Sequence, residues 1–449
     1  MTARRRSSAV LFVSVLTAVA AAVFSGCEPA ESSSGANAAG RTDGGDGRSR
    51  VTIRLLANDH PWIHHTMEHL SDFTRDTGII VEVDVYPEEQ FRAKRTVEML
   101  SGISEFDLFM IMPGNSLSEY HHRGWVEPLD RFIDDPSGTA PSPAVDDFFP
   151  AALAAGVRND RHYSIPILLE TSILAYNREI FDRYGLDVPR TMAELEETAR
   201  AVHEQSEGEI YGITMRGRGA SATSQWADFL HSFGGSWVDR EGNAAIHAPE
   251  SLAALETYGR LLRRYGPRDA TGNGWYESLS IFMRGEAAMI FDANVFRNHY
   301  EDPEQSEIAG SVGYAMLPAG PAGSVPHISH WGLAIYPGSD EKEAAWRFIS
   351  WAAGREQALD AHRAAIPSAL QSVWEDPDVT ESEDGTQWID ASTGSYAVAT
   401  HRWNPPVIEV DEARTAVGEA VIAAILDEGV PAVAEAASRR IDRLQKTVE

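Results

Sequence analysis

Cysteine is nearly absent from this chain. Among its 449 residues there is one, Cys27. No disulfide can form within one molecule, so a disulfide-stapled scaffold is excluded. Basic charge is also scarce, because 38 Lys and Arg stand against 67 Asp and Glu, for a net charge of −29. A chain this acidic lacks the positive surface that binds nucleic acid, so we expect no nucleic-acid partner.

The short motifs of nucleotide-binding and nucleophilic enzymes are missing as well. There is no GxxxxGK[ST] loop and no GxGxxG turn after a strand, and Gly217-Arg218-Gly219 is an isolated fragment. No GxSxG elbow occurs either. A pair of the many carboxylates could flank a glycosidic bond, so an extracellular glycoside hydrolase stays open as an alternative. Without a catalytic signature we expect a binding protein and not an enzyme.

Long apolar runs are confined to the start of the chain. Three arginines at 4–6 precede an apolar run over 9–24 that is shorter than a membrane-spanning helix needs. This order is typical of a signal peptide. The run ends at 24–27 (FSGC), which resembles a bacterial lipoprotein lipobox with phenylalanine where leucine is usual. The resemblance implies a signal peptide over 1–27, cleaved before Cys27, and lipidation of that thiol.

The next segment, 28–49, is rich in Ser, Gly, Ala and Asp and holds almost nothing to bury. We expect it to be a flexible tether. From residue 50 onward roughly 400 residues remain, enough for more than one domain. No second apolar run is long enough to span a bilayer. We therefore expect a folded body outside the cytoplasm, held at the cell membrane by an N-terminal lipid.

Strand and helix patterns alternate through the first part of this body. Residues 51–56, 79–86 and 106–112 predict strands. Apolar residues at helical spacing over 63–73 and 91–100 predict the helices between them. A β-α-β-α-β order predicts a doubly wound α/β sheet, with ligands bound beyond the carboxyl ends of its strands.

The same alternation returns later in the chain. Residues 163–166 and 173–177 predict two short strands. A capping box at Thr191 and a proline at 249 each predict the start of a helix. From residue 341 to the end the pattern is mostly helical.

Four histidines cluster near the start of the body. They form two i, i+4 pairs, a spacing that suits zinc, and they are His60, His64, His65 and His69. A zinc-capture protein is therefore a second alternative. The two pairs point in different directions on a helix, and no cysteine or acidic ligand sits at matching spacing. We therefore expect no metal.

Tryptophans lie in loops or near predicted strand ends, and not at regular helical positions. Aromatic faces stack on the C–H face of a sugar ring, while carboxylates, amides and arginine bond its hydroxyls. Trp237, after two glycines, is assigned to structure. The other tryptophans in this set are Trp62, Trp226, Trp275, Trp331 and Trp403.

An ordered set of short motifs covers nearly the whole mature chain. These motifs are 163–166 (YSIP), 176–181 (YNREIF), 233–237 (FGGSW), 282–289 (FMRGEAAM), 331–335 (WGLAI) and 363–368 (RAAIPS). The set resembles the extracellular solute-binding proteins of ABC importers, in the maltose/glycerol-3-phosphate/polyol-binding group. The resemblance implies a two-lobed periplasmic-binding-protein (Venus flytrap) fold, each lobe a doubly wound sheet. It places hinge crossovers near Pro166, Asp292 and Pro337.

The resemblance also implies how the chain is divided. Residues 50–166 with 291–338 would form an N-lobe, and 167–290 with 339–449 a C-lobe. Ligand would lie between the lobes of a monomer, and closure would present a joint surface to an ABC permease in the membrane. A ligand that contacts both lobes favours the closed state.

Position by position, the resemblance implies a set of ligand-binding residues. Trp226 and Trp275 would stack on the ligand, Asp292 would accept hydroxyl hydrogen bonds, and Arg363 would bridge a hydroxyl or an acid. The full set is His60, Trp62, Glu170, Thr171, Trp226, Trp275, Asp292, His330, Trp331 and Arg363.

The ligand class follows from the same residues. Acids, amides and tryptophans favour a neutral sugar or sugar alcohol as the ligand. Binding of a phosphate ester would usually require clustered Lys and Arg or a free helix N-terminus. The resemblance around Glu170 and His330 favours a monosaccharide or sugar alcohol over a long oligosaccharide. A sensor-linked binding protein would share the fold.

Overall fold

The computed structural model describes residues 51–135, 145–380 and 385–446. The chain divides into two units, Met1–Ser49 and Arg50–Glu449. The predicted signal peptide, the lipidation site Cys27 and the tether 28–49 lie outside the described residues. Within the described part, no helix combines the length and the apolar character that crossing a bilayer requires.

Parallel strands form the first part of the body, as the alternating pattern predicts. Strand β1 (Thr52–Asn58) pairs in parallel with β2 (Ile80–Tyr86) and with β3 (Leu108–Ile111). Helix α1 (Pro61–Thr77) connects β1 to β2, and α2 (Glu88–Ser101) connects β2 to β3. The predicted β-α-β-α-β order is confirmed.

One long strand, β6 (Ile165–Asn177), replaces the two short strands predicted around it. All of its residues are buried. Pro166, which has no N–H to donate, is accommodated at an irregularity in the pairing between Pro166 and Leu168. The strand therefore continues through a proline that was expected to end a short one.

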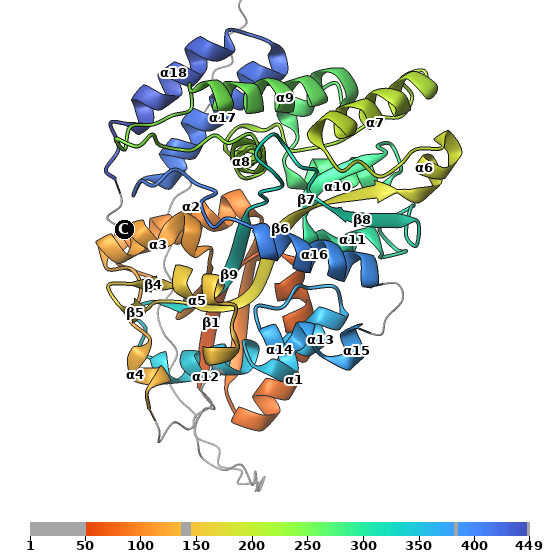
Figure 1. Cartoon of the computed structure of the whole chain (residues 1–449). Helices are drawn as coiled ribbons and strands as arrows, with labels where there is room; N and C mark the ends of the chain where they lie inside the picture. Colours follow the sequence, from red (N-terminus) through yellow and green to blue (C-terminus); the bar gives the residue numbers. More distant parts are fainter. Residues whose placement is uncertain (1–50, 136–144, 381–384, 447–449) are drawn as a thin grey trace, which may run out of the picture. The chain divides into compact units, whose positions relative to one another are not determined.

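Strand β6 runs from one hydrophobic core to the other. Its first part pairs antiparallel with β9 (Ile328–Ile335), which also pairs with β3. Its second part lies between β7 (Met289–Ala293) and β8 (Val312–Met316), again antiparallel. The sheet order is β2-β1-β3-β9-β6-β7, with β8 on β6 (Figure 1). The change of partners falls between Thr171 and Ser172.

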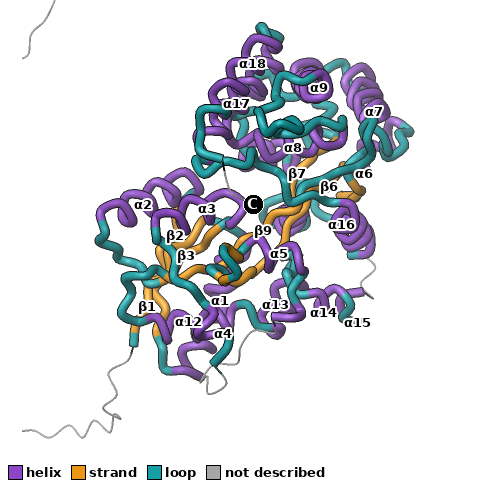
Figure 2. The backbone as a smooth tube through the Cα atoms, turned by 60° about the vertical axis from the view of Figure 1, so that its left-hand side comes forward, coloured by secondary structure: helices purple, strands orange, loops and turns teal. Residues whose placement is uncertain are grey.

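Two clusters of buried side chains flank this crossing. The first core includes β1, β3 and α1, together with α12 (Lys342–Ala352) and α13 (Arg355–Arg363). The second core is mostly helical, and its helices pack around the far end of β6 (Figure 2). They include α7 (Met192–Gln205), α8 (Thr223–Ser232), α9 (Pro249–Tyr265), α17 (Val410–Leu426) and α18 (Val430–Ile441).

The segment 339–449 is shared between both cores. The sequence placed all of it in the C-lobe. Helix α12 instead packs on β9 and α1, because its buried face, which includes Phe348 and Ile349, belongs to the first core. Helices α17 and α18 pack on the second core.

Local signals at helix starts agree with the sequence. The Thr191 hydroxyl accepts a hydrogen bond from the Glu194 backbone N–H at 3.2 Å, and Glu194 accepts one from the Thr191 N–H, so the capping box is confirmed. Pro249 opens α9.

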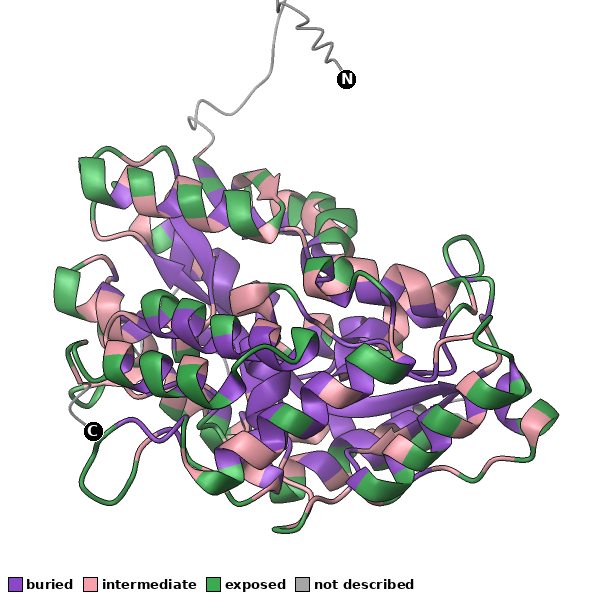
Figure 3. Ribbon diagram, turned by 90° about the horizontal axis from the view of Figure 1, so that it is seen from above, coloured by how far each residue is buried: buried purple, intermediate pink, exposed green. Residues whose placement is uncertain are grey.

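Buried residues follow the strands, and exposed residues follow the outer helix faces (Figure 3). The remaining elements are α3 (Pro113–Arg123), α4 (Asp130–Ile133), α5 (Pro150–Ala155), β4 (Val157–Arg158), β5 (Arg161–His162), α6 (Arg178–Tyr184), α10 (Trp275–Met283), α11 (Arg297–Tyr300), α14 (Gln371–Trp374), α15 (Pro377–Thr380) and α16 (Thr386–Val398).

Candidate ligand-binding site

A pocket lies where the two cores face each other across β6. Its volume is about 670 Å³ when the open space at its mouth is counted. Its walls combine charged groups with flat aromatic rings. The charged groups are Asp59, Glu88, Arg92, Glu170, Arg216, Asp292 and Arg414, and the rings include Trp275, Phe296, Trp331 and Trp403.

The carboxylate of Glu170 is held by His60 on the first-core side. His60 is the N-cap of α1, and its Nδ1 accepts the Trp62 backbone N–H at 3.2 Å. Because Nδ1 is an acceptor, the ring hydrogen of the neutral imidazole lies on Nε2. That atom faces Glu170 Oε1 at 3.2 Å, and both side chains are buried. The Ser329 hydroxyl approaches the other oxygen of Glu170 at 3.5 Å.

The carboxylate of Asp292 is held by Arg216 on the second-core side. The guanidinium donates to both oxygens, from Nε at 3.0 Å and from a terminal nitrogen at 2.5 Å. This two-bond geometry is the strongest that arginine makes with a carboxylate. Burial opposes the charge on Arg216, but Asp292 outweighs it and raises the pKa of the guanidinium. Arg216 is therefore a permanent cation.

Arg216 is itself fixed by neighbours in the second core. Its backbone N–H donates to Gln225 Oε1 at 2.8 Å, and its carbonyl accepts the Tyr258 hydroxyl at 2.5 Å. The Gln225 amide in turn donates to the Phe291 carbonyl, one residue before Asp292. The acid and the base are thus positioned by the same polar network.

A second group of charges lines one rim of the pocket. Arg92 on α2 donates to Glu88 at 2.5 Å and to Asp411 on α17 at 2.9 Å, so it bridges the two cores. Burial tends to raise the pKa of Glu88, but Arg92, Arg216 and Arg414 outweigh it and lower the value.

Arg414 on α17 continues this rim. Its guanidinium donates to Asn404 Oδ1 at 3.1 Å and lies 5.3 Å from the Trp403 ring centre. Burial and the positive charge of Arg92 lower its pKa to about 10, so it stays charged at neutral pH.

The aromatic walls differ between the two sides. Trp331 is almost fully buried and packs 5.8 Å from the His60 ring and 6.3 Å from Phe91. Trp275 is only partly buried and stacks nearly parallel on Phe296, with ring centres 5.4 Å apart. Trp275 therefore has a face available to a ligand ring or chain.

The structure brings together half of the residues that the resemblance implied. His60, Glu170, Trp275, Asp292 and Trp331 all line the pocket. These strand-end and N-cap positions converge because β6, β7 and β9 meet at the crossing.

The other five implied residues do not line it. Trp62 and Trp226 are packed in the first and second cores. Thr171 is buried and donates to the His327 carbonyl at 2.9 Å, and His330 is buried on β9, next to Trp331. Arg363 is exposed at the end of α13. Successive side chains on a strand point to opposite faces. Because Trp331 faces the pocket, its neighbour His330 points away from it.

Several lining residues carried no recognisable signal in the sequence. Arg216 stands beside the glycine fragment at 217–219, where we expected only a loop. Trp403 belonged to the tryptophan set but was not assigned to the site. Asn58 ends β1 and Asp59 follows it, so the rule that ligands bind beyond strand ends could have found them. The missed polar and charged residues are Asn58, Asp59, Glu88, Arg92, Asn115, Arg216, Ser224, Gln225, His327, Ser329 and Arg414.

The four clustered histidines do not form one site. His60 faces Glu170, and His64 contacts Asp59 at 2.7 Å. His65 and His69 instead contact Asp360 on α13. The helical spacing separates the set, because consecutive residues point about 100° apart.

Comparison with known proteins agrees with this architecture. Residues 66–359 match the sequence profile of the bacterial extracellular solute-binding proteins, and the chain belongs to that family. The predicted two-lobed α/β fold, class of protein and extracytoplasmic location are thereby confirmed.

Relatives of known specificity cover most of the chain. A mannitol-binding protein of Pseudomonas aeruginosa is 29% identical over 313 residues, which is 68% of this chain and 69% of the relative. An erythritol/L-threitol-binding protein of Mycolicibacterium smegmatis is 28% identical over 389 residues, covering 81% and 80% of the two chains.

Solved structures extend the likeness to nearly the whole described body. A solute-binding protein of Agrobacterium radiobacter in complex with ribitol superposes with a TM-score of 0.78 at 25% identity, covering 88% of this chain and 98% of that one. A solute-binding protein of Agrobacterium vitis with bound D-mannitol gives a TM-score of 0.77 at 24% identity, covering 87% and 97%.

Proposed function

We propose that this protein binds a small neutral polyol or monosaccharide in the pocket between its two cores and delivers it to an ABC importer. One observation carries the proposal. Two carboxylates, Glu170 and Asp292, enter the pocket from its two sides, and each is held in place by a basic partner. Fixed carboxylates are strong acceptors for hydroxyl hydrogen bonds.

The charge balance of the pocket supports a neutral ligand. Three arginines line it, Arg92, Arg216 and Arg414, but the first two are already paired with acids. Four acidic side chains line the same pocket. An anionic ligand would meet acids on every side, whereas hydroxyls can both donate to these carboxylates and accept from arginine.

The relatives support a polyol in particular. Two of them are named for mannitol and for erythritol/L-threitol, and the solved structures described above hold ribitol and D-mannitol. Linear polyols present hydroxyls along a chain of C–H groups, so they can bond the carboxylates and still pack on Trp275.

The further roles belong to the same proposal. We propose that the protein is anchored through a lipid on Cys27, acts as a monomer, and performs no catalysis. Glu170 and Asp292 have hydrogen-bond partners, His60 and Arg216, that suit fixed acceptors. A hydrolase would instead need one of the acids to deliver a proton to the leaving group.

A thermal-shift screen tests the ligand class. Ribitol, mannitol, erythritol, glucose, glycerol 3-phosphate and a tripeptide are each titrated into the purified protein. We expect the Tm to rise with concentration for at least one neutral polyol or monosaccharide. A shift with the phosphate ester or the peptide alone would contradict the proposal.

A further inference from the structure

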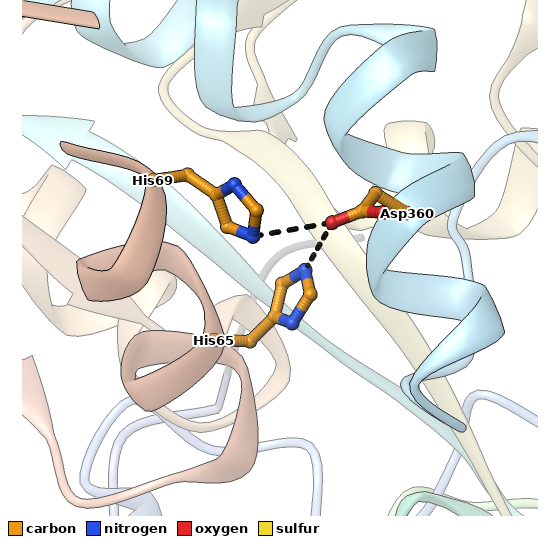
Figure 4. Close-up of side chains that lie close together, drawn as sticks. All are labelled: His65, His69 and Asp360. Atoms are coloured by element: carbon orange, nitrogen blue, oxygen red, sulfur yellow. Dashed lines mark ion pairs between the residues drawn. The ribbon is translucent and has the colours of Figure 1, made fainter. Parts of the chain in front are cut away.

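Helices α1 and α13 of the first core bring two histidines and an aspartate to one point, away from the polyol pocket. His65 and His69 lie one turn apart on α1, and Asp360 faces them from α13 (Figure 4). Both imidazoles direct Nε2 at the same carboxylate oxygen, Oδ2, at 3.1 and 3.2 Å. We propose that His65, His69 and Asp360 bind a zinc ion.

The distances fit a tetrahedral site. Zinc binds imidazole nitrogen and carboxylate oxygen at about 2.0 to 2.2 Å, which places neighbouring ligand atoms about 3.3 Å apart. The two nitrogen–oxygen separations already lie close to that value. All three ligand atoms lie within 4.8 Å of one another, so a small ring rotation completes the triangle. Water would take the fourth position, because the three side chains are 15, 31 and 44% exposed.

The contacts are poorly explained as hydrogen bonds alone. The Nε2 atom of His65 is buried, and its 3.1 Å contact with the Asp360 carboxylate is not directed as a good hydrogen bond is. Buried polar atoms are rarely left in this way. Metal ligands behave differently, because their lone pairs point at a shared centre and not at one another.

The ligand set selects zinc over the common hard cations. Calcium and magnesium prefer oxygen ligands, whereas imidazole suits zinc and its neighbours in the first transition row. The site does not overlap the polyol pocket, which none of the three residues lines. Zinc would instead join α1 to α13 and so stabilise the first core.

Isothermal titration of zinc into untagged protein tests the inference. A Cys27→Ser background removes the chain's one thiol. We expect one equivalent of zinc to bind and the Tm to rise with zinc concentration. Calcium and magnesium should give neither effect. Absence of saturable zinc binding up to 1 mM would overturn the proposal.

Matched variants locate the ion. His69→Gln and Asp360→Asn should each weaken zinc binding by at least about tenfold, while His64→Gln, on the same helix and facing Asp59, should bind as the parent does. Far-UV circular dichroism confirms that each variant is folded. Unchanged zinc affinity in a folded His65→Gln/His69→Gln double variant would disprove the site, whatever the polyol screen finds. Anomalous scattering at the zinc edge should place the peak among these three side chains.

Discussion

The two sides of the pocket hold their carboxylates in different ways. On the first-core side, Glu170 has one contact with an imidazole and a longer one with a serine hydroxyl. On the second-core side, Asp292 has two bonds to the guanidinium of Arg216, whose backbone N–H is held by Gln225. The second side is the more rigid. The first side keeps more of its acceptor capacity for a ligand.

This contrast indicates a division of labour. In the proposed function, the rigid pair of Arg216 and Asp292 fixes where the ligand lies on the second core. The carboxylate of Glu170 on β6, near the point where the strand changes partners, is less tightly held and so can adjust to the ligand. The predictions below weaken one side at a time.

Removing the cation of the rigid pair is expected to have an effect as large as any described below. Arg216→Met leaves the Asp292 carboxylate, which is 1% exposed, without its partner. Stranding a buried charge costs about 3 to 5 kcal/mol of unfolding free energy. Urea unfolding measures the loss. The control Arg216→Met/Asp292→Asn removes the unpaired buried charge and should regain much of the stability. If the single variant were as stable as the parent, this account would be contradicted.

The two tryptophans should separate stability from affinity. Trp331→Ala opens a hole beside His60 and Phe91, and should cost about 3 to 5 kcal/mol of stability together with ligand affinity. Trp275→Ala removes a partly exposed ring, so it should weaken polyol binding about 2- to 10-fold with a smaller loss of stability. Calorimetry and urea unfolding give both quantities. Equal stability losses would show that the two aromatic walls do not differ.

Acid should destabilise the first-core side through His330. Burial lowers its pKa to about 4, against a usual value near 6.5. Below pH 6.5 the His330 imidazole binds a proton in the unfolded chain but not in the folded chain, so the free energy of unfolding falls until about pH 4. Between pH 7 and pH 4.5 this contributes roughly 2.5 kcal/mol.

Replacing the imidazole checks this assignment. Urea unfolding of His330→Leu should be less dependent on pH than unfolding of the parent, by roughly the same 2.5 kcal/mol between pH 7 and 4.5. An identical pH profile for the two proteins would remove His330 as the cause.

The smallest effect is expected at the rim. Asp411 pairs with Arg92 across the two cores, but its side chain is 73% exposed. Solvent screening limits such pairs to well under about 1 kcal/mol. Asp411→Asn should therefore weaken polyol affinity by less than about fivefold, and more so at low salt than at high salt. A loss of affinity that is independent of salt would show that the rim acts in another way.

Much of the fold could be predicted from local pattern. The alternation of strands and helices over 51–112 and the capping box at Thr191 could be predicted, because each depends only on residues that are close in the sequence. The continuous strand β6 was missed because a proline usually interrupts a strand, and the irregular pairing that accommodates Pro166 is visible only in the folded sheet. The packing of α12 on the first core was missed because an amphipathic pattern predicts a helix with one buried face but does not show which part of the protein that face packs against.

The site was less predictable than the fold. His60 and Asp292 follow or end strands, so strand-end reasoning and family resemblance found them. Arg216 and Arg414 reach the pocket only through tertiary packing, and nothing in their sequence neighbourhood sets them apart. Asp360 was missed for the same reason. It lies almost 300 residues after His65 and contacts it only because α13 packs on α1.

The most direct test is calorimetric titration of the polyol selected by the screen into the parent, Glu170→Gln and Asp292→Asn. The account predicts that each variant loses about 10- to 100-fold in affinity, the value of a charge-assisted hydrogen bond. Asp182→Asn, an exposed carboxylate on α6, should bind as the parent does. Unchanged affinity in both pocket variants would contradict the claim that carboxylates on the two sides of the pocket hold one ligand.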